Sequence, residues 1–286
     1  MSKIAESDLI INPDGSVYHL NLLPEDIADT IITVGDPERV AEVSKHFDNV
    51  EVRKSKREFV THTGYLNSKR ISVVSTGIGT DNIDIVLNEL DALVNIDFEN
   101  RIVKDEIKQL EIIRLGTSGT IREDIPTGSI LASTHGLGLD SLMNFYNRKL
   151  TGDELLLENN LNCYFEHDDL VPYITAANGK LLDKISAGFE RGITVTAPGF
   201  YAPQGRNVRA KGSLPNLIDK LSKYSFEGHI ITNLEMETAG IYALANVFGH
   251  KAVSINAIVA NRLKFEFAKD PDAVIQKMIT SVLERL

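Results

Sequence analysis

The sequence predicts an α/β protein built around a central β-sheet. Short runs rich in β-branched residues are typical of buried strands, and segments with helical periodicity lie between many of them. The strand-like runs are IITV from Ile31, ISVVS from Ile71, EIIRL from Glu111, ITVTA from Ile193 and AVSINAIVA from Ala252. Alternation of strand and helix is typical of α/β folds, in which helices cover the faces of the sheet.

Helical signals fall between these runs and near the end of the chain. Pro37 stands where a first-turn proline is favoured and opens PERVAEVSKHF, while DNIDIVLNELDALV from Asp81 repeats apolar residues at spacings of three and four. METAGIYALANVF from Met236 predicts a further helix, and DPDAVIQKMITSVLERL predicts an amphipathic helix that packs on the core. TGDELLLENN from Thr151 is expected to be an ordinary surface segment.

Length and charge limit the classes of function. The 286 residues carry 30 basic and 40 acidic side chains, a net charge of −10, which argues against a general nucleic-acid or anionic-membrane surface. With 43% apolar residues we expect a single domain over residues 1–286. Cys163 is the lone cysteine, the N-terminus lacks a secretory leader pattern, and no apolar run approaches the roughly 20 residues that cross a bilayer, so we expect a cytoplasmic protein without membrane contact.

Polar or glycine-rich turns are expected after three strands, at GDPER, STGIGTDN and GTSG. Such positions matter because ligands of α/β sheets bind at the carboxyl ends of strands. At the first turn, Gly35 lets the backbone approach a ligand and Arg39 projects from the first helical turn, which predicts an anion cradle; an ordinary turn with a solvated arginine is the alternative. Before the third turn, Arg114 lies in an apolar strand and needs a partner, either an anion or a carboxylate in a structural ion pair.

Two later segments supply groups suited to a polar ring and a sugar. In GFYAPQGRNVR, the Gln204 amide can donate to and accept from a uracil-like ring, Arg206 can donate to a carbonyl, and Phe200 can pack on the ring face. The alternative for this segment is a surface loop with incidental arginines. In NLEMETAG, Glu237 is a suitable acceptor for a vicinal diol, although the helix dipole also favours carboxylates at a helix start.

Other chemistry finds little support in the sequence. The seven histidines show no HExxH or paired-ligand spacing, and a single cysteine excludes a thiolate cluster, so we expect no catalytic metal. No GxSxG elbow occurs, and GIGTDN lacks the third glycine of a dinucleotide fingerprint. The basic segment KSKREF around Arg57, taken alone, is expected to be a solvated face.

Eight segments occur together in one order, namely VYHLNL, VGDPERV, KSKREF, STGIGTDNI, IIRLGTSG, GFYAPQGR, NLEMETAG and IVANR. This series, from about Val17 to Arg262, resembles the uridine phosphorylase branch of the nucleoside phosphorylase superfamily. The resemblance implies a mixed, twisted central sheet that is partly barrel-like and flanked by helices. It also implies phosphorolysis of uridine, and of deoxyuridine or thymidine as open alternatives, to uracil (thymine from thymidine) and (deoxy)ribose 1-phosphate in pyrimidine salvage and catabolism. Inorganic phosphate is then a co-substrate, and no organic cofactor is needed.

The same resemblance assigns a phosphate site that two subunits share. Its phosphate ligands match Gly35, Arg39, Arg114 and Thr117. Arg57 is similar to an arginine that a neighbouring subunit contributes to the phosphate, and His19 to that neighbour's contact with the ribose 5′-hydroxyl. These two matches imply a homo-oligomer with shared active sites.

The ribose and base positions follow in the second half of the chain. The ribose segment matches Glu235, Met236 and Glu237, with Glu237 as the holder of the 2′- and 3′-hydroxyls. Gln204 and Arg206 match the pair that reads uracil, Phe200 is similar to its packing partner, and Arg262 is similar to an arginine near O4 of the base. The catalytic group implied by these matches is Arg114, Arg206 and Glu237. The purine-specific branch has an aspartate where residues 260–262 read ANR, which disfavours a purine substrate.

Two departures from the family pattern bear on assembly and ion binding. The connection NIDFENRIVKDEIKQL is longer than that of the compact bacterial hexamers and is similar to connections in eukaryotic relatives that include dimers. We expect at least a dimer, with a hexamer built as a trimer of dimers as the larger alternative. Glu58 and Ile78 match a site for a monovalent cation, whereas Asn82 stands where serine is usual, so a structural cation stays open.

Three other functions remain as alternatives. A purine nucleoside phosphorylase is disfavoured by Gln204, Arg206 and the missing aspartate. A nucleosidase of the same superfamily would not need the full set of phosphate-binding arginines. A non-catalytic nucleoside sensor would be expected to lose some of them, and none of the matched positions is lost.

Overall fold

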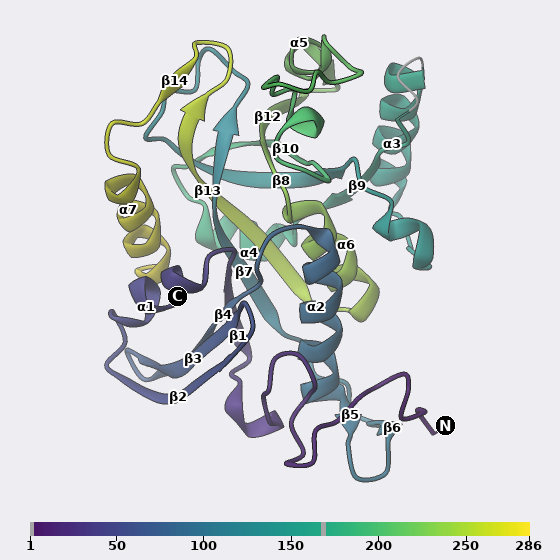
Figure 1. The fold of residues 1–286 in the computed structure, drawn as a ribbon, viewed down its shortest axis with the longest axis vertical. Coiled ribbons are helices and arrows are strands. Elements are labelled where there is room, and N and C mark those ends of the chain that lie inside the picture. The colour runs from purple at the N-terminus through teal and green to yellow at the C-terminus, as the bar shows by residue number, and fades with distance from the viewer. Residues whose placement is uncertain (1–2, 167–169) are drawn as a thin grey trace.

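A mixed β-sheet organises the chain in the computed structural model, which describes residues 3–166 and 170–286 (Figure 1). The strands are β1 Thr30–Val34, β2 Asn49–Lys56, β3 Phe59–Leu66, β4 Lys69–Ser75, β5 Ile96–Asp97, β6 Ile102–Val103, β7 Glu111–Thr120, β8 Ile130–Gly138, β9 Tyr173–Ala176, β10 Glu190–Thr196, β11 Ser225–Phe226, β12 His229–Glu235, β13 Lys251–Asn261 and β14 Glu266–Phe267. The α-helices are α1 Pro37–Ser44, α2 Thr80–Asn95, α3 Gly152–Phe165, α4 Gly179–Ile185, α5 Leu217–Lys223, α6 Thr238–Phe248 and α7 Pro271–Leu283. Short 3₁₀ turns cover Pro24–Asp26, Leu142–Phe145 and Ala202–Gln204.

Five strands of the described chain close into a barrel. β10 lies between β12 and β8, β8 pairs with β13, β13 pairs with β7, and β7 pairs back with β12 through Gly119 and Thr120. The pairs β10–β12, β10–β8 and β13–β7 are parallel, whereas β13–β8 and β12–β7 are antiparallel. This arrangement confirms the mixed, partly barrel-like sheet.

The sheet continues beyond the barrel through β1, β4, β3 and β2. β1 runs parallel to both β7 and β4, while β4, β3 and β2 form antiparallel hairpins. Parallel pairing brings the carboxyl ends of β1 and β4 together beside the middle of β7, and the carboxyl ends of strands are where α/β sheets bind ligands. The strands predicted from Ile31, Ile71, Glu111, Ile193 and Ala252 are confirmed as β1, β4, β7, β10 and β13.

The helices cover this sheet as their patterns predict. Pro37 begins α1 directly after Asp36, whose side chain accepts from the Glu38 N–H at 2.9 Å and caps the helix. The predicted helix from Asp81 is confirmed as α2, and the C-terminal amphipathic helix is confirmed as α7, with Met278 and Ile279 buried. None of the described helices is both long and apolar enough to cross a membrane.

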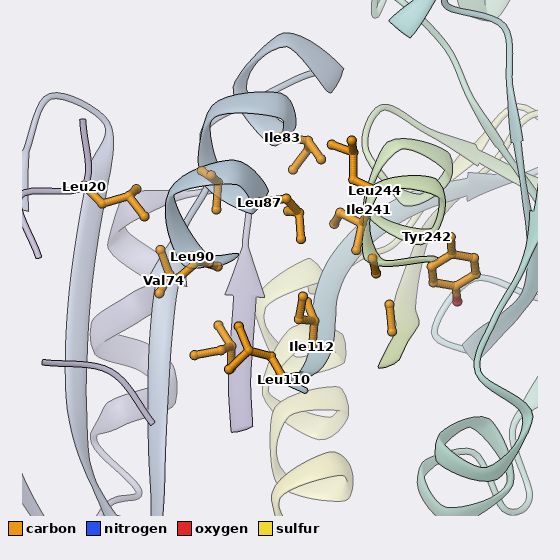
Figure 2. Close-up of a cluster of buried hydrophobic side chains, with 14 of the residues drawn as sticks. Leu20, Val74, Ile83, Leu87, Leu90, Leu110, Ile112, Ile241, Tyr242 and Leu244 are labelled. Atoms are coloured by element: carbon orange, nitrogen blue, oxygen red, sulfur yellow. The ribbon is translucent and has the colours of Figure 1, made fainter. Parts of the chain in front are cut away.

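Helices α2 and α6 lie side by side against the sheet, and apolar side chains fill the space between them (Figure 2). Ile83 and Leu87 of α2 face Ile241 and Leu244 of α6, and Leu90 of α2 belongs to the same buried cluster. All five are fully buried, and complete burial of such a side chain contributes about 1.5–3 kcal/mol. This core fixes the start of both helices, where the candidate site lies.

One sequence expectation is wrong. GTSG is not a turn: residues 116–119 continue β7, because Gly116, Thr117 and Ser118 stay in register with β13. Glycine and hydroxyl residues favour turns locally, and the strand pairing overrides that preference. TGDELLLENN is mostly exposed, as expected of a surface segment, and its Thr151 and Glu154 form a capping box that opens α3.

Candidate active site

A cavity of about 690 Å³ opens at the carboxyl ends of β1, β4 and β12 and beside the far half of β7. This volume lies within the range of about 300–1,000 Å³ that is common for small-molecule sites. The cavity brings together ten of the residues that the sequence singled out: Gly35, Arg39, Arg114, Thr117, Phe200, Gln204, Arg206, Glu235, Met236 and Glu237.

The cavity exists because β7 changes its neighbour along its length. β7 pairs with β1 as far as Leu115, where it faces Val34, and it pairs with β12 from Gly119 onward. Between these points, and within the part of the chain that the structure describes, Gly116–Ser118 pair only with β13, so one edge of their backbone is left without a strand. Backbone groups at such a gap are available to a ligand.

The Arg114 guanidinium is clamped at this gap. Its Nη2 donates to Glu237 Oε2 at 2.5 Å and forms an ion pair with Glu235 Oε2 at 2.9 Å, and its Nη1 donates to Asn256 Oδ1 at 3.1 Å. Although burial opposes the charged form, the two carboxylates raise the pKa of Arg114. The ion-pair alternative for this buried arginine is therefore confirmed, and the pair forms part of the cavity wall.

Gly116 lies directly beneath that guanidinium. A Cβ at this position would stand 1.8 Å from Arg114 Nη1 and 2.3 Å from Cζ. Residues 114 and 116 lie on the same face of the strand, so the long arginine folds back over the glycine. Only glycine leaves room for it.

Arg39 supplies a second cation to the cavity. Its side chain is partly buried and makes no hydrogen bond or ion pair with any residue in the described ranges. Burial lowers the pKa of Arg39, and the nearby charge of Arg114 adds to this effect. An anion placed near both guanidinium groups would relieve this repulsion, so the two arginines favour phosphate-like ligands.

The two glutamates at the end of β12 have different surroundings. Glu235 accepts from the backbone N–H groups of Glu237 and Thr238 at 2.9 Å each, so its carboxylate caps the start of α6. Glu237 accepts from the Gly79 N–H at 2.9 Å and from Arg114. Burial, reinforced by the charge of Glu235, raises the pKa of Glu237.

The GFYAPQGR segment forms a stacked and hydrogen-bonded group at the other end of the cavity. The Arg206 guanidinium lies 3.7 Å from the centre of the Phe200 ring, and its Nη1 donates to Gln204 Oε1 at 2.6 Å. Arg262 Nη1 donates to the Gln204 carbonyl at 3.0 Å. Burial, followed by the charge of Arg262, lowers the pKa of Arg206 to about 10, so the side chain is cationic at neutral pH.

Residues 260 and 261, where the purine branch would place an aspartate, offer no acid to this cavity. Ala260 lines the wall with its methyl group. Asn261 is buried, and its amide is used by the carbonyls of Arg122 and Ile125 and by the N–H groups of Leu263 and Lys264. Its role is to hold the backbone after β13.

His19 and Arg57 lie outside the cavity of their own chain. His19 lines a separate cavity of about 470 Å³, where its Nδ1 lies 2.7 Å from the buried carboxylate of Glu89. Arg57 is exposed in the turn between β2 and β3, 5.8 Å from the Tyr18 ring, and His19 packs edge-on against the same ring. His19 and Arg57, the two residues that the resemblance assigns to a neighbouring subunit's site, thus lie together around the Tyr18 ring.

The three residues compared with the family's monovalent-cation site line the main cavity. Glu58, Ile78 and Asn82 lie around Gly77, whose φ of 68° belongs to the left-handed region that favours glycine. The sequence analysis did not predict other residues that line this cavity, notably Phe267 on β14, whose side chain is 66% exposed. It also missed Asn256, although a polar side chain in an apolar strand signals a buried partner.

Comparisons with known proteins agree with this geometry. A family model described as the phosphorylase superfamily matches residues 29–286. A uridine phosphorylase of Thermococcus kodakarensis is 31% identical over 260 residues, 90% of this chain and 81% of the relative. A DeoD-type purine nucleoside phosphorylase of Bacillus velezensis is 32% identical over 241 residues, 83% of this chain and 84% of the relative.

Solved structures agree as well. A nucleoside phosphorylase of Trypanosoma brucei, which shows uridine phosphorylase activity, superposes with a TM-score of 0.87 at 29% identity, over 98% of this chain and 99% of that one. Because the named relatives include both uridine and purine enzymes at similar identity, the residues at the cavity must decide between the two bases.

Proposed function

The chain belongs to the phosphorylase superfamily and is a pentosyltransferase, and we propose that it cleaves uridine with inorganic phosphate to uracil and ribose 1-phosphate. The observation that carries the choice of base is the Gln204–Arg206 pair at the cavity, with Ala260 on the same wall. An amide and a guanidinium side by side match the alternating carbonyl and N–H groups of uracil. An apolar alanine gives no acid to protonate a purine nitrogen.

Phosphate would bind at the gap in β7. Arg39 and Arg114 would contact its oxygens, together with the Thr117 hydroxyl and the backbone at Gly35. A phosphate held there would lie beneath C1′ of the ribose, where it stabilises the developing oxocarbenium ion and attacks as the bond to the base lengthens. The reaction then needs no covalent enzyme intermediate and no organic cofactor.

The departing base would be stabilised at the opposite end of the cavity. As the N-glycosidic bond breaks, negative charge grows on uracil, and a donor aimed at its carbonyl becomes stronger in the transition state. Arg206 would be that donor, while Gln204 would orient the ring and Arg262 would add positive charge near O4. Phe200 already packs on the Arg206 guanidinium and would extend this flat surface to the base.

The ribose would lie between these ends. Glu237 would accept from the 2′- and 3′-hydroxyls, with Glu235 and Met236 completing the ribose segment. Glu237 also accepts from Arg114. The residue that would hold the ribose and the residue that would hold the phosphate therefore belong to one buried ion pair.

The proposal includes a shared site and a salvage role. Two copies would each contribute His19 and Arg57 to the cavity of the other, since both residues lie outside the cavity of their own chain. We further propose that residues 1–286 act as one domain and that the enzyme works in cytoplasmic pyrimidine salvage, in an assembly of at least two copies.

Product analysis tests the proposal directly. The purified protein is incubated with uridine, thymidine and inosine, each with and without inorganic phosphate, and free base and sugar phosphate are followed together. The expected result is phosphate-dependent release of uracil with ribose 1-phosphate. Release of hypoxanthine in place of uracil would move the chain to the purine enzymes, release without phosphate would make it a hydrolase, and binding without turnover would make it a sensor.

A further inference from the structure

The interior of the five-strand barrel contains a chain of side-chain hydrogen bonds that begins at Arg114. Arg114 Nη1 on β7 donates to Asn256 Oδ1 on β13 at 3.1 Å. Asn256 Nδ2 then donates to Ser133 Oγ on β8 at 3.0 Å, and Ser133 Oγ lies 2.5 Å from Thr194 Oγ1 on β10. Asn256, Ser133 and Thr194 are fully buried.

The same chain returns to β7 on the other side of Gly116. Thr194 Oγ1 donates to Asn233 Oδ1 on β12 at 2.8 Å, and Asn233 Nδ2 donates to Ser118 Oγ at 2.9 Å. Each of the five barrel strands thus contributes a polar side chain, and the series begins and ends at the cavity wall. A buried polar network with every member satisfied is rigid and favours one arrangement of its members.

Donor and acceptor chemistry determines how the Asn256 amide is oriented. A guanidinium has donors only, so Asn256 must present its oxygen to Arg114 and its NH₂ group to Ser133. The Ser133 hydroxyl, which accepts from Asn256, can then donate to Thr194, which in turn donates to Asn233. All of these directions are mutually consistent, so the barrel holds the amide oxygen against Nη1.

We propose that Asn256 is a positioning residue for anion binding, which holds the Arg114 guanidinium over Gly116 without cancelling its charge. Nη2 of Arg114 already contacts two carboxylates, those of Glu235 and Glu237. A third carboxylate at position 256 would leave the site with excess negative charge, and an apolar residue would leave Nη1 free to swing. A neutral acceptor holds the group while the second Nη1 N–H and the Nε–H remain for the anion.

The inference rests on the proposed phosphorolysis for its kinetic readout, so the test also measures phosphate binding alone. Wild type, Asn256→Ala and Asn256→Asp are compared by calorimetric titration with inorganic phosphate and by KM for phosphate and for uridine. Loss of a hydrogen bond to a charged group in Asn256→Ala, and the added negative charge in Asn256→Asp, each predict a rise of about tenfold to a hundredfold in the Kd and KM for phosphate. The KM for uridine should change much less.

A matched control separates positioning from folding. Thr120 is fully buried on the same strand as Arg114, and its Oγ1 donates to the Thr232 carbonyl at 2.8 Å, outside the Arg114 chain. Thr120→Val should lower the melting temperature and leave phosphate affinity unchanged. Asn256→Asp keeps the size and the acceptor toward Arg114 but loses the Nδ2 donor to Ser133, so its melting temperature is measured beside its phosphate affinity, and it decides the question if Asn256→Ala does not fold.

The outcomes for the two proposals are distinct. Phosphate affinities of Asn256→Asp and Asn256→Ala within about twofold of wild type would overturn the positioning role, whatever the enzyme does to uridine. An inactive wild type that binds phosphate more tightly than these variants would overturn the proposed function and support the role of Asn256.

Discussion

The Arg114 guanidinium and the Glu237 carboxylate form a buried ion pair, in which Nη2 lies 2.5 Å from Oε2. Both side chains line the cavity, and both are more than nine-tenths buried. One partner belongs to the candidate anion site and the other to the candidate ribose site. Removing one member of a buried pair typically costs about 3–5 kcal/mol, since the other charge is left without a partner. Several consequences of this pair can be measured.

Gly116→Ala is expected to disrupt the arginine end of the pair. The new Cβ would lie 1.8 Å from Arg114 Nη1, and the guanidinium is held by three acceptors, so it must leave its position or strain the strand. We expect a rise of at least about tenfold in the KM for phosphate and a loss of about 1–3 kcal/mol in the free energy of unfolding. Gly152→Ala is the control, because nothing lies within 4 Å of its Cβ. Equal phosphate KM values for both variants would contradict the assignment.

The carboxylate end predicts a pH dependence of stability. Burial raises the pKa of Glu237 above its unfolded value of 4.5, so the folded state holds this proton more tightly than the unfolded state. The stabilisation is complete below pH 4.5 and is lost as the pH rises through the folded pKa. Glu237→Gln cannot titrate, so its free energy of unfolding should fall less steeply between pH 4.5 and neutrality. Urea denaturation across that range checks this, and parallel slopes for the two proteins would refute it.

Arg206→Ala is expected to act on the base and to spare the phosphate. Loss of one preorganised donor typically costs about 10²–10³ in rate, and we expect that fall in kcat/KM for uridine. Arg206→Lys keeps a charge but loses the planar group that stacks 3.7 Å from the Phe200 ring centre, so it should rescue little. Steady-state kinetics with each substrate varied in turn gives the answer. A change confined to the KM for phosphate would show that Arg206 does not read the base.

Local patterns in the sequence were sufficient for the elements that carry the site. The strand IITV and the first-turn Pro37 predict where Arg39 emerges, and the structure has them there, with Asp36 as the cap of the helix. The barrel could not be predicted in the same way, because its closure depends on Gly119 and Thr120 meeting Leu234 and Asn233 more than a hundred residues away. Pairing with β13, which is equally distant in the sequence, explains why GTSG, which has the composition of a turn, remains in a strand.

The hydrogen-bonded side chains inside the barrel were not predicted, for a related reason. Asn256 and Ser133 are polar residues in apolar strands and so signal buried partners, but the identity of those partners follows only when β13 and β8 are placed beside each other. Conversely, the sequence resemblance assigned Arg57 to a neighbour's phosphate and His19 to the ribose 5′-hydroxyl, whereas a single chain leaves both residues outside the cavity. Their assignment depends on a second copy and stays a prediction.

Glu237→Ala should discriminate between sugars. A carboxylate that accepts from both the 2′- and 3′-hydroxyls loses more with a riboside than with a 2′-deoxyriboside, which already lacks one of these donors. We therefore expect the kcat/KM for uridine to fall by about tenfold more than that for deoxyuridine. The ratio of the two values in wild type and variant is the measurement. An identical fall for both substrates would remove the diol role, while leaving the ion pair with Arg114 as the cause of the loss.

Mixing two inactive variants tests whether sites are shared between copies. Arg57 is exposed on the patch around Tyr18, and Arg114 is buried at the cavity, so Arg57→Ala and Arg114→Ala should each abolish most activity on their own. In a mixed dimer, one site would combine the intact Arg114 of one chain with the intact Arg57 of the other, and the second site would lack both. Because half of the randomly formed dimers are mixed and half of their sites are intact, co-refolded variants should regain about a quarter of wild-type activity. Activity that stays at the level of the separate variants, in a sample shown to be mixed by mass, would mean that Arg57 does not serve a neighbour's cavity.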